Sequence, residues 1–148
     1  MRPIASLAVL LPVFSLLACG GDSARESAQR AAHRDWCIAE ELAVQANAQI
    51  STMDTLSAGN DLIAARLYPF AKAFYDFAKA RELELALLDS AAAAETPDDS
   101  TQLATRAAQA RPRAPAGDVE TNAAQDYQRR FAEALGNPSH PCHTAARE

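Results

Sequence analysis

Apolar residues recur at intervals of three and four along most of the chain, the spacing that places them on one face of a helix. The first such stripe begins after Asp35 and comprises Ile38, Leu42, Ala46, Ile50, Met53 and Leu56. Gly59 then suits the left-handed residue that ends many helices, and Asn60 or Asp61 can cap the next helix. The pattern therefore predicts a long helix that ends just before Gly59.

A second stripe follows at once and is the most apolar part of the chain. It comprises Ile63, Leu67, Phe70, Phe74 and Phe77, and it resumes after Arg81 with Leu85 and Leu88. Pro69 interrupts the stripe, and because proline lacks an amide hydrogen it is expected to kink or restart the helix. The short connection between the two long helices predicts an antiparallel helical hairpin.

Two shorter helices are predicted after the hairpin. Thr96 can act as the N-cap of the first, with Pro97 at its first position, but only Leu103 offers a bulky apolar contact, so we expect a peripheral helix. Asp118 can cap the second. Its apolar positions are Val119, Ala123, Tyr127, Phe131 and Leu135. The run Gly136-Asn137-Pro138 should end it.

No segment shows the sustained alternation typical of strands. We therefore predict an all-α fold, a small antiparallel helical bundle built on the long hairpin with two shorter C-terminal helices. The apolar content of 49% is largely alanine, and the 148 residues include only one Trp, five Phe and three Tyr. Such a core is thin, so we expect extra stabilisation from a disulfide, a partner protein or self-association into a homo-oligomer.

The N-terminal segment has the features of a targeting signal. Met1 and Arg2 precede the mostly apolar run from Ile4 to Leu17, which is shorter than the about 20 residues that a membrane span needs. The run ends in Leu16-Leu17-Ala18-Cys19, which resembles the bacterial lipobox. That resemblance implies a lipoprotein signal peptide at 1–18, removed when Cys19 is lipidated, then a lipid anchor and flexible tether at 19–31 and a helical domain at 32–148.

The resemblance also implies a location in the cell envelope, with the lipid anchor attaching the protein to a membrane. In many Gram-negative lipoproteins an Asp directly after the lipidated cysteine retains the protein in the inner membrane. Gly20 stands there in this chain, so for a Gram-negative source the resemblance implies the outer membrane, facing the periplasm.

With Cys19 assigned to lipid, Cys37 and Cys142 remain as a pair. Exported proteins fold in oxidising surroundings, where an even number of cysteines favours a disulfide. The predicted Cys37–Cys142 disulfide would fasten the C-terminal tail to the first long helix.

The histidines offer an alternative that stays open at this point. His33 lies one helical turn before Cys37, and His140 and His143 flank Cys142. Together with the thiolates, His33, His140 and His143 are candidate ligands for zinc or copper, although their spacing matches no familiar zinc signature. The two interpretations exclude each other, because a disulfide sulfur is not a thiolate ligand.

The sequence gives little support for a catalytic site, a phosphate-binding loop or a nucleic-acid-binding surface. The acidic pairs Glu40-Glu41, Glu82/Glu84 and Asp98-Asp99 are interpreted as solvated helix faces and caps. Ser139-His140 lacks the supporting residues of a hydrolytic triad, and no glycine-rich phosphate loop occurs. A net charge of −5 without a basic cluster argues against nucleic-acid binding.

These observations predict a membrane-anchored envelope lipoprotein that is not an enzyme and needs no cofactor. It would act through contacts with a protein partner, as adaptor, inhibitor or immunity-type protein. The alternative is a periplasmic metal-binding lipoprotein for copper or zinc.

Overall fold

The computed structural model describes residues 20–57, 61–113 and 117–145, without the side chains of residues 20–23, 57, 61–64 and 145. The predicted signal peptide at 1–18, the predicted lipidation site Cys19 and the predicted helix end at Gly59 lie outside the described residues.

Five helices and no strand make up the described ranges, which confirms the all-α class. The helices are α1 (Gly20–Ser57), α2 (Asp61–Ala93), α3 (Pro97–Ala110), α4 (Asp118–Gly136) and α5 (Pro141–Ala145). Helix α5 was not predicted, because five residues are too few to show a helical period in the sequence.

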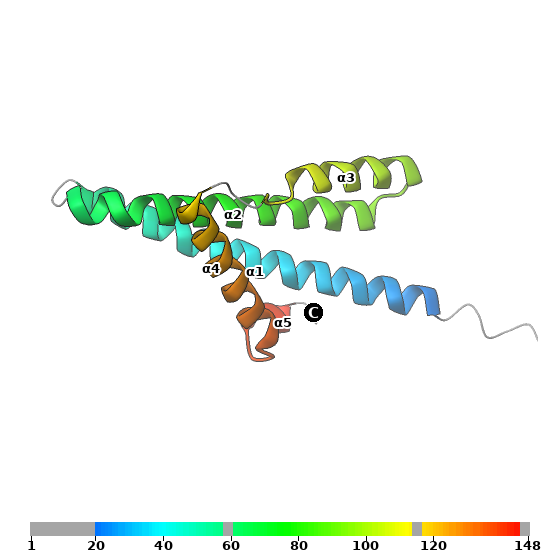
Figure 1. Cartoon of the computed structure of the whole chain (residues 1–148). Helices are drawn as coiled ribbons and strands as arrows, with labels where there is room; N and C mark the ends of the chain where they lie inside the picture. Colours follow the sequence, from blue (N-terminus) through cyan, green and yellow to red (C-terminus); the bar gives the residue numbers. More distant parts are fainter. Residues whose placement is uncertain (1–19, 58–60, 114–116, 146–148) are drawn as a thin grey trace, which may run out of the picture.

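The two long helices run antiparallel and form the hairpin on which the other elements pack (Figure 1). Helix α3 lies along the C-terminal half of α2, and α2 is the only described helix that it contacts. Helix α4 crosses the hairpin steeply and touches both α1 and α2, and α5 follows at its far end, against α1. The peripheral position predicted for α3 is therefore correct.

Helix α1 starts earlier than predicted. It begins at Gly20, so the segment at 20–31 interpreted as a flexible tether is helical. Alanine, arginine, glutamate and glutamine dominate this segment, and all four favour helix. It also contacts α2, since Arg25 Nη2 donates to the carbonyl oxygen of Ala92 at 3.1 Å.

Two further details refine the prediction. Helix α2 continues through Pro69 and does not restart there, since the exposed proline removes only one hydrogen bond from a long helix. Helix α4 has Gly117 as its N-cap and Asp118 as its first residue, so it begins one position earlier than predicted. The Thr96 cap of α3 is confirmed, because its side chain accepts from the amide of Asp99.

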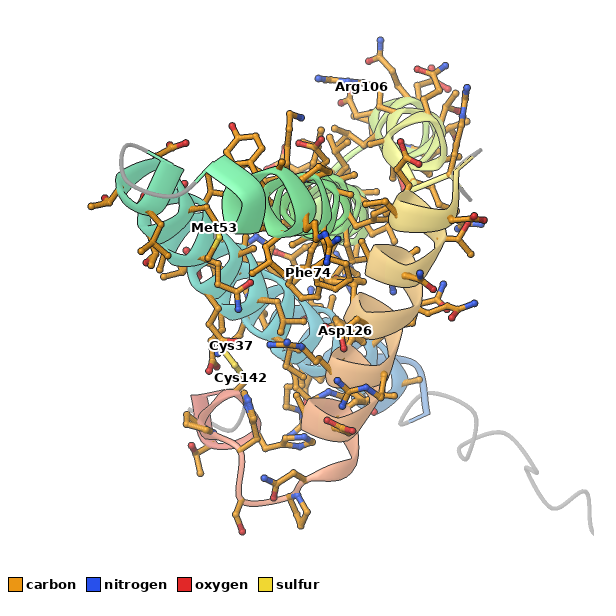
Figure 2. The ribbon with its side chains drawn as sticks, turned by 60° about the vertical axis from the view of Figure 1, so that its left-hand side comes forward. Cys37, Met53, Phe74, Arg106, Asp126 and Cys142 are labelled. Atoms are coloured by element: carbon orange, nitrogen blue, oxygen red, sulfur yellow. A yellow bond between two sulfur atoms is a disulfide. The ribbon has the colours of Figure 1, made fainter. Side chains whose placement is uncertain are left out.

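The core lies where α1, α2 and α4 meet, and small residues fill much of it. Its large members are Ile38, Leu42, Phe74 and Tyr127, and Figure 2 shows Phe74 at the centre. Ala46, Ala78 and Ala123 are fully buried between them, which allows the helix backbones to approach closely. Leu56 and Leu67, near the hairpin tip, stay 45% and 48% exposed, because α4 crosses the hairpin farther from the tip and does not cover them (Figure 1).

Cys37 and Cys142 form a disulfide, with Sγ atoms 2.04 Å and Cα atoms 5.6 Å apart (Figure 2). Cys142 is 1% exposed and belongs to the core. The bond joins α5 to α1 and closes a loop that contains α2, α3 and α4. The pairing predicted from the cysteine count is the one that the structure has.

We expect the double variant Cys37→Ser/Cys142→Ser to lose roughly 2–4 kcal/mol in free energy of unfolding, since the cross-link restricts an unfolded loop of about 100 residues. Urea unfolding of the full chain measures the loss. Wild-type protein treated with a dithiol should match the double variant. Equal stability of oxidised and reduced wild type would contradict this account.

Candidate functional site

A buried carboxylate marks the most polar point of the interior. Glu84 is 1% exposed, and each of its oxygens is bound by a different guanidinium. Arg81 Nη1 lies 2.7 Å from Oε2, and Arg111 Nε lies 2.8 Å from Oε1. A buried charge is costly unless it is paired and hydrogen-bonded, so the two arginines are what allow Glu84 to be buried.

Glu84 is buried, so the interpretation of Glu82/Glu84 as part of a solvated helix face was wrong for Glu84. The signal that could have corrected it is spacing, because Glu84 stands seven residues after Phe77 and so returns to the same side of α2. Arg81, one turn earlier, lies on that side too. Arg111 comes from the segment after α3, and no local pattern reveals a partner at that distance along the chain.

A surface pocket of about 630 Å³ lies beside this ion cluster, between α2, the segment after α3, and α4. Arg81, Glu84 and Arg111 line its charged part. Phe77, Tyr127 and Phe131 line its apolar part. Its volume falls in the range of small-molecule sites, and its lining combines aromatic rings with a few polar groups, as such sites do.

The aromatic rings that line the pocket contact one another and the Arg81 guanidinium. The guanidinium of Arg81 lies 5.5 Å from the centroid of the Phe131 ring, a cation–π distance. Tyr127 packs between Phe74 at 5.8 Å and Phe131 at 5.9 Å. These contacts fix the rings that line the pocket.

Tyr127 carries a buried hydroxyl that has no hydrogen-bond partner among the described residues. Burial raises the pKa of Tyr127 well above its ordinary value, while the positive charge of Arg81 lowers it by less. The phenol is therefore neutral at physiological pH and keeps its proton as a donor.

A second cluster of polar side chains lies beside the disulfide and consists of Glu41 and His140. His140 Nε2 lies 3.4 Å from Glu41 Oε2, and the amide of Cys142 donates to His140 Nδ1 at 3.3 Å. Because Nδ1 accepts, the proton of the neutral ring lies on Nε2, next to the Glu41 carboxylate. One ligand atom each from Glu41, His140 and Cys142 lies within 4.8 Å of the other two.

The three candidate metal ligands His33, His140 and His143 have different neighbours. His33 Nε2 lies 3.8 Å from Asp89 of α2, and His143 Nε2 donates to the carbonyl oxygen of Ala134 at 3.2 Å. His33 also lies eight residues before Glu41 on α1, about 12 Å along the helix axis. Among these histidines, His140 alone has a carboxylate and a cysteine sulfur around it.

None of the helices in the described ranges combines the length and the apolar character that crossing a membrane requires. No protein-family model, curated protein or solved structure matches this chain.

Replacing Tyr127 by phenylalanine is expected to raise the free energy of unfolding by about 1 kcal/mol, because the variant no longer buries an unpaired hydroxyl. Urea unfolding of both proteins measures the change. The control is Tyr68→Phe, at a half-buried tyrosine of α2, which should stay within about 0.5 kcal/mol of wild type. A clear loss of stability in Tyr127→Phe would contradict this interpretation.

Proposed function

We propose that this chain is a lipid-anchored envelope protein that acts without catalysis, through contacts with a protein partner, as adaptor, inhibitor or immunity-type protein. The observation that carries the proposal is the lipobox-like Leu16-Leu17-Ala18-Cys19, followed directly by a helix that begins at Gly20. For a Gram-negative source, the proposed location is the outer membrane, on its periplasmic side.

The partners of the polar groups support a role without catalysis. Both oxygens of Glu84 are occupied by guanidinium groups, and Thr96 and Asp99 cap α3. His143 fastens α5 to the last turn of α4. The ion pairs and hydrogen bonds of these residues stabilise a fold whose apolar core is small.

The course of α1 supports close attachment to the membrane. The helix passes from Gly20 into the core at Ile38 and Ala39 without a break. Two contacts, from Arg25 to Ala92 and from His33 to Asp89, hold its first half against the end of α2. A lipid on Cys19 would thus hold the domain near the bilayer, with a fixed orientation for its partner.

The first test is removal of the lipidation site. In cells that express the full chain, Cys19→Ser should move the protein from the membrane fraction to the soluble fraction, or leave it as the uncleaved precursor. Cys37→Ser is the matched control, because it also replaces one cysteine and should stay with the membranes. Unchanged fractionation and mass in Cys19→Ser would contradict lipid anchoring.

The partner is tested with wild type and Cys19→Ser. Wild type carrying a C-terminal tag is solubilised from membranes and purified next to Cys19→Ser. We expect one protein to co-purify at near-equal amounts with the wild type, and to retain the chain when it is tagged in turn. If no protein co-purifies reciprocally and the purified chain turns over a substrate, the proposal is wrong.

The second candidate function is metal binding, and the Glu41, His140 and Cys142 cluster favours it. Because the sulfur of Cys142 is in the disulfide, we propose this role for the reduced protein, in which Cys37 and Cys142 supply thiolates beside His140 and Glu41. Cysteine, histidine and carboxylate together suit zinc.

The zinc content of the reduced and the oxidised protein tests this candidate function. Tag-free protein reduced with a dithiol, then incubated with zinc and desalted, should hold about one ion per chain. Oxidised protein should hold none. His140→Ala should lower the content of the reduced form, whereas His33→Ala should not. Equal zinc in the oxidised and reduced proteins, or no effect of His140→Ala, would end this candidate.

A further inference from the structure

We propose that the pocket between α2 and α4 binds a small aromatic carboxylate. This inference is independent of the membrane anchor and of the partner, because it depends only on the residues that line the pocket.

The charge of the pocket selects the head group of the ligand. Two guanidiniums, from Arg81 and Arg111, meet one carboxylate, from Glu84, which leaves one positive charge in excess. The side chain of Arg111 is 67% exposed and binds Glu84 through Nε. A guanidinium bound through Nε still has donor N–H groups on its terminal nitrogens, and a planar carboxylate is the group that it binds best.

The apolar wall selects the body of the ligand. Phe77, Tyr127 and Phe131 line the pocket next to Ala124 and Pro112, so the charged end is continuous with a surface of rings. Phe131 is held by the Arg81 guanidinium and by the Tyr127 ring. Flat aromatic bodies gain most from such surfaces, because rings pack face to face or edge to face against them.

Tyr127 contributes to the apolar wall and not to the head-group site. The residue lines the pocket, but its hydroxyl is buried and has no partner among the described residues, so its ring is the part available to a ligand.

Three compounds with one body and different charges test the proposal. They are 1-naphthaleneacetate, its neutral amide, and 1-naphthylmethylamine, which is a cation. Binding to the full chain in non-ionic detergent is measured by calorimetry against a detergent blank. We expect the carboxylate to bind about tenfold more tightly than the amide, because a charge-assisted hydrogen bond is lost, and the amine to bind more weakly still.

Variants test separately where the carboxylate of the ligand binds and where its aromatic body binds. Arg111→Gln should bind carboxylate and amide equally, whereas Arg113→Gln, at an exposed arginine outside the lining, should keep the preference. Gln128→Trp adds a bulky side chain at an exposed lining position and leaves Arg81, Glu84 and Arg111 unchanged, so it should weaken the binding of all three compounds. Circular dichroism checks that each variant is folded.

Equal affinities for the three compounds in the wild type, or binding by none of them, would overturn the proposal. So would a carboxylate preference that survives in Arg111→Gln. If the folded Gln128→Trp variant binds all three as the wild type does, the ligands bind elsewhere and the pocket is not their site.

Discussion

The disulfide between Cys37 and Cys142 holds together parts of the molecule that packing alone connects weakly. Helix α5 has five residues, packs against α1 and makes one hydrogen bond to α4, from His143 to Ala134, and helices that short are marginal in water. The cross-link places Cys142 in the core and brings His140 beside Glu41 and His143 beside Ala134. The end of α4 is thereby held at both sides, by its own contacts with the hairpin and by the tail that follows it.

The ion cluster around Glu84 has a similar role at the end of α3. It joins α2 to Arg111, the residue at which α3 ends. A core made mostly of alanine gains little from each buried side chain, since free energy of burial follows apolar area. One covalent bond and one buried ion cluster compensate for that shortage. Both connect segments that are distant in sequence, where they restrict the chain most.

The helices could be predicted because their signals are local. Stripes of apolar residues gave the hairpin and α4, and Thr96-Pro97 gave the start of α3. The start of α1 was missed because residues 20–31 have no apolar stripe, although their composition favours helix. The disulfide followed from assigning Cys19 to lipid and pairing the two cysteines that remained, which needs no geometry. The pocket was out of reach, since Arg111 and Phe131 come together only when α3 and α4 take their places.

Exposure along the predicted stripes also depended on tertiary packing. Phe74 and Leu67 look alike in the pattern, yet Phe74 is 1% exposed and Leu67 is 48% exposed. The difference lies in where α4 crosses the hairpin, and the sequence of α2 does not contain that information. Periodicity thus identified the face of each helix, and the crossing of a third helix decided which part of the face became core.

Helix α3 illustrates what such a layout permits. It contacts only α2 among the described helices, its start is capped by Thr96, and its exit is fixed where Arg111 meets Glu84. Between these two points α3 packs on α2 through Ala107, which is 1% exposed, and it takes no part in the core between α1, α2 and α4. Substitutions on the exposed side of α3 should therefore leave that core unchanged, provided that Arg111 is retained.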